Sequence, residues 1–327
     1  MIILGCDTSC DDTAIGIIQV INNKITILAN IKISQNEMIE KYGGVVPEVS
    51  ARTHLENIDQ VLTIALNTAN IQLKDVDIFS VTAGPGLISC LIIGYDFIST
   101  LAHLLNKPIY YIHHVEAHAS VCFIQEDVLI LIISGGHTSI IHRQQNKYKT
   151  ICNTLDDAAG EVLDKIAREL HLPFPYGPSI EQIANKNKQY KVIMKGRRDF
   201  SFAGLKTHCL NMVKDNCDIP DIAAFLQNSI AEQIKEKLIL SIQHTSVKTI
   251  IVCGGVANNH KIRNSLQDLN CIFAPVNLCT DNGVMVAMNC YYRYQNNLSI
   301  NIQPFSSMSL DDWSNLNHSN FQMIKNI

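Results

Sequence analysis

One pattern recurs in this chain: a short apolar run, a turn of small and hydroxyl-bearing residues, and a second apolar run. It occurs at residues 2–20 (IILGCDTSCDDTAIGIIQV) and again at residues 129–143 (LILIISGGHTSIIHR). A third segment, 249–259 (TIIVCGGVANN), has the apolar run and the Gly-Gly turn but leads into an expected helix at 259–269. Two such hairpins, about 125 residues apart, predict a duplicated unit with a cleft between the copies.

The intervals between these hairpins have the composition of helices. Three segments are predicted to be helical, at residues 48–69, 157–170 and 221–244. Strands that alternate with such helices predict an α/β fold. A chain of 327 residues, 47% of them hydrophobic, is long enough for about two globular domains with cores of their own.

The apolar segment 87–105 has the length of a membrane span, but Asp96 lies at its middle. A central aspartate costs roughly 2.5–3.5 kcal/mol on insertion, so we expect a buried helix and no membrane partner. Met1 leads into IILG without a basic leader, and the eleven cysteines include no C-x-x-C pair. These features predict a protein of the reducing cytoplasm. A net charge of −4 means that a polyanionic partner would need a local basic patch.

Residues 113–118 read HHVEAH and follow a strand-like run. If they are helical, His114 and His118 are one turn apart on one face, a spacing at which two imidazoles can share a metal. Glu116 would point roughly 160–200° away from both, so it cannot serve as the base of a zincin-type metallopeptidase. From the spacing alone, two structural histidines are an equally good interpretation. Asp281 is a candidate third ligand, and two imidazoles with one carboxylate suit zinc or ferrous iron.

The turn after the second apolar run contains Gly135 and Gly136, whose backbone N–H groups could approach an anion closely. A Gly-Gly hairpin is more often only a tight turn. The chain has no G-x-x-x-x-G-K-[ST] motif, and GPGLIS (84–89) has Ser where a dinucleotide fingerprint needs Gly or Ala. A P-loop or Rossmann enzyme is therefore disfavoured.

A series of longer motifs runs through nearly the whole chain. In order, they are GCDTSCDDTAIG (5–16), YGGVVPE (42–48), TAGPGL (82–87), HHVEAH (113–118), SGGHT (134–138), DDAAGEVLDK (156–165), DFSFAGLKT (199–207), GGVANN (254–259) and CTDNGVMVA (279–287). Together they resemble the tRNA N6-threonylcarbamoyladenosine transferase family, once described as O-sialoglycoprotein endopeptidases.

This resemblance implies the two-lobed fold of actin, Hsp70 and sugar kinases, made of duplicated ribonuclease H-like units with the active cleft between them. We expect a first lobe at 1–125 plus 290–327 and a second lobe at 126–289. The implied reaction moves a threonylcarbamoyl group from threonylcarbamoyl-AMP to the N6 amine of the adenine beside the anticodon, in tRNAs that read codons beginning with A. The implied partners are an inactive paralogue and a P-loop ATPase.

The resemblance also implies roles for individual residues. His114, His118 and Asp281 match the family's ligands for one divalent metal, iron or zinc. The family's substrate-nucleotide contacts match Ile132, Ile133, Ser134, Gly135, Gly136, Asp164, Gly177 and Asn259. Because an adenine amine must lose a proton as it attacks, we expect Asp11 to be the general base, with Asp12 as second candidate and a metal-bound hydroxide as third.

Three features depart from the family pattern. Asp7 and Asp12 stand where glutamates are usual, Tyr176 replaces a glycine in PYGP (175–178), and the segment before Asp199 is short. A small-molecule kinase or ATPase of the same superfold is the alternative function, and a metallopeptidase or a non-catalytic scaffold is less favoured.

A basic stretch, KNKQYKVIMKGRR (186–198), lies in the shortened segment. It contains no acidic residue, and we expect Lys195, Arg197 and Arg198 to contact tRNA phosphates. A solvated charged surface is an equally good interpretation of such a run.

Overall fold

The chain forms two α/β units whose sheets have the same strand order. The computed structural model describes residues 1–122, 124, 127–185 and 199–319, so the basic stretch with Lys195, Arg197 and Arg198 lies outside the described residues. One unit contains residues 1–124 and 281–327, and the other contains residues 125–280. The second boundary falls nine residues before the expected one, because the helix that begins at Gly283 packs on the first strands of the chain.

The first unit contains a five-stranded sheet in the order β3-β2-β1-β4-β5. Strands β1 and β2 form the first predicted hairpin and β3 extends it antiparallel, whereas β4 and β5 run parallel to β1. The strands are β1 (Ile2–Asp7), β2 (Asp12–Ile21), β3 (Lys24–Ser34), β4 (Ile78–Gly84) and β5 (Ile109–His113). The parallel strands end beside one another, and the segment that follows β1 contains Asp11.

The second unit repeats this arrangement in the order β8-β7-β6-β9-β10. Here β6 and β7 form the second predicted hairpin, and β9 and β10 follow parallel to β6. The strands are β6 (Val128–Ile133), β7 (Thr138–Gln144), β8 (Lys147–Asn153), β9 (Ile250–Cys253) and β10 (Cys271–Phe273). The predicted duplication of an α/β unit is therefore confirmed, with β9 as the counterpart of β4.

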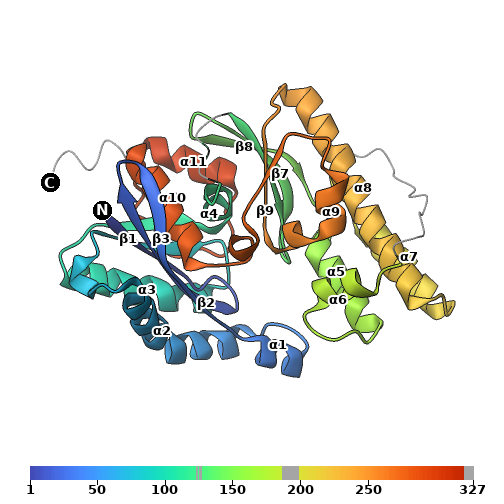
Figure 1. The fold of residues 1–327 in the computed structure, drawn as a ribbon, viewed down its shortest axis with the longest axis horizontal. Coiled ribbons are helices and arrows are strands. Elements are labelled where there is room, and N and C mark those ends of the chain that lie inside the picture. Colours follow the sequence, from blue (N-terminus) through green and yellow to red (C-terminus); the bar gives the residue numbers. More distant parts are fainter. Residues whose placement is uncertain (123, 125–126, 186–198, 320–327) are drawn as a thin grey trace. The chain divides into compact units, whose positions relative to one another are not determined.

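Helices cover both faces of the first sheet (Figure 1). On one face lie α2 (Pro47–Ala69) and α3 (Ile88–Leu104), which contact each other as well as the strands. On the other face lies α10 (Gly283–Gln295), which contacts β1, β2 and α4 (His114–Ser120). The remaining elements of this unit are α1 (Asn36–Tyr42), η1 (Leu73–Asp75) and α11 (Leu310–Ser319). Among the described residues, none of the helices combines the length and apolarity that a membrane crossing requires.

Helices of the second unit agree with two of its three expected helical segments. The segments 157–170 and 221–244 correspond to α5 (Ala159–Glu169) and α8 (Ile219–Thr245). The expected helix at 259–269 is shorter, since α9 (His260–Ser265) ends where the chain turns toward β10. The other elements are α6 (Tyr176–Ile183), α7 (Ala203–Lys214), η2 (Gly255–Asn258) and η3 (Val276–Leu278).

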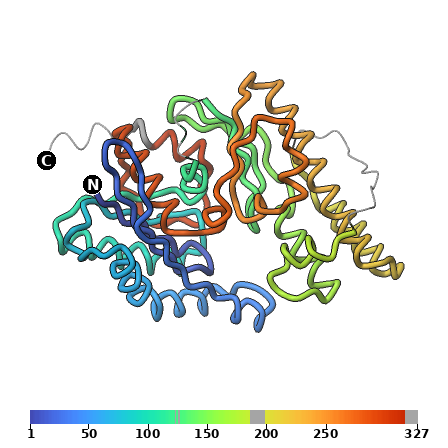
Figure 2. The backbone as a smooth tube through the Cα atoms, viewed as in Figure 1, coloured from blue at the N-terminus to red at the C-terminus, as the bar shows by residue number. Residues whose placement is uncertain are grey.

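Three glycines let α10 touch the sheet backbone to backbone. A Cβ atom on Gly5 of β1 would lie 2.4 Å from the amide nitrogen of Ala287, and one on Gly16 of β2 would lie 2.2 Å from that of Val284. A Cβ atom on Gly283 would lie 2.0 Å from the amide nitrogen of Gly16. No side chain fits at these contacts. Helix α10, near the end of the chain, is thereby held against β1 and β2 (Figure 2).

We predict that Gly16→Ala destabilises the first unit by about 3 kcal/mol or more, because the obstructing atoms are backbone and cannot rotate away. Urea unfolding followed by circular dichroism measures the change. Gly204→Ala in α7 is the control, since a Cβ there meets nothing within 4 Å and alanine is the better helix former by about 0.5–1 kcal/mol. Equal stabilities of the Gly16→Ala variant and the wild type would contradict the proposed contact.

Candidate active site

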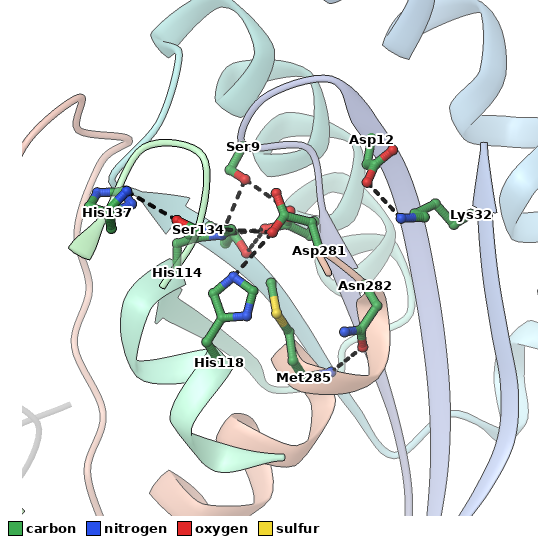
Figure 3. Close-up of polar contacts among 12 residues, drawn as sticks. Ser9, Asp12, Lys32, His114, His118, Ser134, His137, Asp281, Asn282 and Met285 are labelled. Carbon is green, nitrogen blue, oxygen red and sulfur yellow. Dashed lines mark hydrogen bonds and ion pairs between the residues drawn. The ribbon is translucent and has the colours of Figure 1, made fainter. Parts of the chain in front are cut away.

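Two histidines and one aspartate of the first unit converge (Figure 3). His114 and His118 lie one turn apart on α4, and their rings meet edge to face with centroids 4.8 Å apart. Asp281 directly precedes Asn282, whose side chain caps the N-terminus of α10 by accepting from the amide of Met285. Asp281 Oδ1 lies 3.1 Å from His118 Nε2 and 3.6 Å from His114 Nε2. The helical spacing predicted from HHVEAH is confirmed.

The donor atoms of this cluster fit a metal ion. One atom from each of the three residues lies within 4.8 Å of the others. Ligands bound about 2.0–2.2 Å from a tetrahedral metal are about 3.4 Å from one another, which is close to the separations from Asp281 Oδ1. Two imidazole nitrogens and one carboxylate oxygen are also a donor set that zinc and ferrous iron accept.

The buried carboxylate of Asp7 contacts His114 at the ring nitrogen that does not face Asp281. Asp7 Oδ1 lies 3.3 Å from His114 Nδ1 and accepts the hydroxyl of Thr82 at 2.5 Å, while Oδ2 accepts the hydroxyl of Ser9 at 2.9 Å. Such a contact keeps the ring proton on Nδ1 and leaves Nε2 available for a metal. The sequence drew attention to Asp7 only as a departure from Glu and missed Ser9 and Thr82. The sequence signal for Thr82 was its position near the end of β4, because polar residues at the ends of neighbouring parallel strands lie close together.

The charges of the cluster perturb one another. Burial disfavours a charged His114, but the carboxylates of Asp281 and Asp7 outweigh burial and raise the pKa of His114 to about 9. Burial raises the pKa of Asp281, but the facing rings of His114 and His118 outweigh burial and hold this pKa below its ordinary value. Without a metal, the cluster therefore holds a proton on His114 at neutral pH.

Glu116 faces away from the cluster and anchors α4. Its Oε2 accepts hydrogen bonds from Arg293 Nη1 at 2.8 Å and from Trp313 Nε1 at 2.9 Å. All three side chains are fully buried, and the guanidinium of Arg293 lies 4.9 Å from the Trp313 ring centroid. Glu116 thus ties α4 to α10 and α11, which agrees with the expectation that it cannot act on a metal-bound water.

The two candidate bases occupy different surroundings. Asp12 begins β2 and binds Lys32 Nζ of β3 at 2.8 Å, and burial raises the pKa of Asp12 to about 6 in spite of that lysine. Asp11 is partly buried in the preceding turn. Burial raises the pKa of Asp11 above its ordinary value, a hydrogen bond with Cys10 opposes that shift, and the charge of Asp281 adds to it. Burial is thus the main cause of the raised pKa of Asp11, and the charge of Asp281 contributes to it.

In the second unit, the β6–β7 turn is closed by its own atoms. The amide of Ser134 donates to the carbonyl of His137 at 2.8 Å, and the amide of His137 donates to Ser134 Oγ at 3.1 Å. Gly135 and Gly136 are exposed, and a Cβ on either would meet nothing within 4 Å. Folding of the described residues does not require glycine here, so the open backbone is suited to a ligand.

Other predicted substrate contacts have structural roles as well. Ile132 and Ile133 are buried core residues of β6. Asn259 is also buried: its Oδ1 accepts from the amide of Ile262 at 3.1 Å as the N-cap of α9, and its Nδ2 donates to Gln227 Oε1 at 2.7 Å. Asn259 therefore has a structural role, while its second amide proton and second lone pair leave the expected ligand contact a prediction.

Asp164, by contrast, is a partly buried carboxylate of α5. Burial raises the pKa of Asp164 to about 6, although the charge of Arg168, one turn further along, opposes that shift. The guanidinium of Arg168 lies 5.6 Å from the ring centroid of Tyr176, the residue that departs from the family pattern. The next residue, Gly177, has open space at its Cβ position.

Solved structures share the class of fold that these paired units define, the ATPase-type fold of actin, Hsp70 and sugar kinases. HypF from T. kodakarensis matches with a TM-score of 0.62 and 13% identity, over 90% of this chain and 47% of that one. The activator of the 2-hydroxyisocaproyl-CoA dehydratase from Clostridium difficile, with bound ADPNP, matches with a TM-score of 0.56 and 18% identity, over 93% and 100%. At these identities the likeness concerns the fold.

Sequence comparison identifies the family. A model of the tRNA N6-adenosine threonylcarbamoyltransferase family (TsaD) matches residues 26–288. Proteins of that name are 37% identical in Thermosipho melanesiensis, over 95% of this chain and all of the relative, and 38% identical in Dictyoglomus turgidum, over 90% and 94%. The chain belongs to this family, as the sequence motifs indicated.

We predict that the purified protein binds close to one transition-metal ion per chain, and that replacing His114 and His118 together by Ala abolishes this. Because the metal needs a neutral His114 and the pKa of His114 is about 9, the apparent affinity should fall about tenfold per pH unit below that pH. Elemental analysis and titration against a chelator measure both effects. His142→Ala, which alters a His–Asp pair of the second unit, is the control. Full metal retention in the double variant would refute the assignment.

Proposed function

We propose that this protein transfers the threonylcarbamoyl group from threonylcarbamoyl-AMP to the N6 amine of the adenine beside the anticodon, in tRNAs that read codons beginning with A. Membership of the family supports the type of reaction. The observation that carries the proposal is the His114–His118–Asp281 cluster together with Asp11, a carboxylate whose pKa is raised in the adjoining turn of the same unit.

Asp11 acts as the general base of this step. The N6 nitrogen attacks the carbonyl carbon of the donor, the bond from that carbon to the phosphate oxygen breaks, and AMP leaves with the electron pair. The proton released from N6 passes to the carboxylate of Asp11. A raised pKa brings a carboxylate nearer to the value that suits proton transfer at neutral pH. Asp12 is less suited, because Lys32 engages its carboxylate at 2.8 Å.

The cluster holds one divalent metal, iron or zinc. His114 and His118 supply imidazole nitrogen, Asp281 supplies carboxylate oxygen, and Asp7 keeps His114 in the required tautomer. A bound metal supplies positive charge that stabilises negative charge developing on the donor's oxygens. The residues themselves place that charge at a buried position, where electrostatic interactions are strong.

The second unit binds the adenylate part of the donor. The open glycine turn of Gly135 and Gly136 offers backbone N–H groups to phosphate. Asp164 accepts from ribose hydroxyls, and Gly177 leaves room for the sugar or base. Ser134 takes part through its hydroxyl, and Ile132, Ile133 and Asn259 complete the substrate contacts that the family resemblance implies.

The alternatives are less well supported. A small-molecule kinase or ATPase would share the fold, but family membership points to an acyl transfer and the metal cluster has two histidines. A metallopeptidase needs a carboxylate base beside the metal, and Glu116 is bound instead to Arg293 and Trp313.

We propose that an inactive paralogue and a P-loop ATPase assist this protein, as the family resemblance implies, and that the basic stretch with Lys195, Arg197 and Arg198 contacts tRNA. We also propose a cytoplasmic location. The eleven cysteines include no C-x-x-C pair, which suits a reducing compartment.

We expect the chain to form threonylcarbamoyladenosine and AMP when it is incubated with threonylcarbamoyl-AMP, unmodified tRNA and its partners. Asp11→Asn should lower kcat by at least about 100-fold, because it removes the proton acceptor, and should change donor binding much less. Quantification of the modified nucleoside by mass spectrometry measures turnover, with Asp12→Asn as the matched control. Casein cleavage or sugar phosphorylation without tRNA modification would overturn the proposal, and a larger kcat loss in Asp12→Asn would transfer the role of base to Asp12.

Asp164→Asn should weaken donor binding yet stabilise the protein at neutral pH. The pKa of Asp164 is about 6 in the folded chain and 3.8 in its ordinary state, so the folded state holds this proton more tightly than the unfolded chain. The carboxylate therefore costs stability increasingly as pH rises from about 4 to about 6, and fully above that range. Thermal unfolding should show a higher Tm for the variant at pH 7.5 and no difference near pH 4. A lower Tm at pH 7.5 would contradict this account.

A further inference from the structure

A buried histidine outside the metal cluster spans the turn that contains both candidate bases. His54 lies on the buried face of α2 and is fully buried. Its Nε2 is 3.0 Å from the backbone carbonyl of Cys10, and its Nδ1 is 2.7 Å from the hydroxyl of Thr13. Cys10 and Thr13 directly flank Asp11 and Asp12, so one imidazole contacts the chain on both sides of the two carboxylates.

The two contacts determine the state of the ring. A carbonyl oxygen only accepts, so Nε2 must carry a proton and donate it to Cys10. A neutral ring then presents Nδ1 as an acceptor, and the hydroxyl of Thr13 donates to it. Burial lowers the pKa of His54, which favours this neutral tautomer at physiological pH. The ring is thereby a donor toward one end of the turn and an acceptor toward the other.

Contacts from α3 and from its N-cap residue, Leu87, hold the start of the same turn. The hydroxyl of Thr8 donates to the carbonyl of Cys90 at 3.0 Å, and the amide of Leu87 donates to the carbonyl of Ser9 at 2.8 Å. These contacts end before Asp11. Beyond them, the contacts of His54 tie the turn to α2.

We propose that His54 is a positioning residue that holds the β1–β2 turn, and with it Asp11, in place. Ser9 of the same turn contacts the cluster, since its Oγ lies 3.2 Å from His114 Nδ1. The inference rests on the proposed function of Asp11 as general base. Positioning matters to such a group, because a displacement of about 1 Å in a reacting group can cost about 100-fold in rate.

Kinetics of three variants test this role. His54→Leu removes both hydrogen bonds and should lower kcat about 10- to 100-fold, with the KM for the donor changed by less than about twofold. His54→Gln retains an amide that can donate to Cys10 and should lose less. Thr13→Val removes one hydroxyl and leaves the contact with Cys10, so it should have the smallest effect.

A double-mutant cycle shows whether His54 acts through Asp11. In the Asp11→Asn background, His54→Leu should lower the residual rate by no more than about twofold, because residues that act as one unit are strongly non-additive. Independent effects that multiply, or a loss confined to donor binding, would overturn the proposal.

Alkylation of cysteines provides a readout that needs no activity. Cys10 lies in the turn, whereas Cys6 is fully buried in β1 of the same unit. His54→Leu should increase the labelling rate of Cys10 by iodoacetamide at least about fivefold, measured on peptides, while Cys6 stays protected and the metal content is unchanged. Unchanged labelling of Cys10 would overturn the inference, and equal labelling of Cys6 would assign His54 to general stability instead. If the wild-type protein shows no transferase activity, the proposed function fails, and this labelling still decides whether His54 holds the turn.

Discussion

The close contact between α10 and the first two strands underlies the organisation of the first unit. Because Gly5, Gly16 and Gly283 have no side chains, backbone packs directly on backbone at distances that no other residue allows. Asp281 lies two residues before Gly283, so this backbone contact also determines where Asp281 lies. A carboxylate 163 residues away in sequence is therefore brought within 3.1 Å of His118. The metal cluster depends on this packing as much as on its three donor residues.

Buried polar contacts then hold the histidines in a defined orientation. Asp7 fixes the tautomer of His114 from one side of α4, and Glu116 fixes the helix itself through Arg293 and Trp313. A charge buried in a protein is costly unless it is paired and hydrogen-bonded, and Glu116 and Arg293 satisfy this condition together. The glutamate that makes HHVEAH look like a peptidase motif instead anchors the helix.

The two units share one topology but differ in the residues of the turn between their first two strands. In each, the hairpin of the first two strands carries a short turn at the end of the sheet. In the first unit that turn contains Asp11, and His54 contacts the residues on either side of it. In the second unit it contains Gly135 and Gly136, which are exposed and have open space at their Cβ positions. The two units thus share one strand order but have different residues in the corresponding turn.

Sequence by itself determined the α/β class, the duplicated hairpins, the longer helices and the spacing of His114 and His118. These features depend on local periodicity and on residues close together in the chain. Family motifs added Asp11 and Asp281. Tertiary structure alone decided that Asp12 pairs with Lys32, that Asn259 donates to Gln227 and that Glu116 binds Arg293 and Trp313. It also brought His54 to the turn and Thr82 to Asp7. Each of these contacts joins residues that are far apart in the chain, and their partners depend on how helices and strands pack, which no local pattern in the sequence encodes.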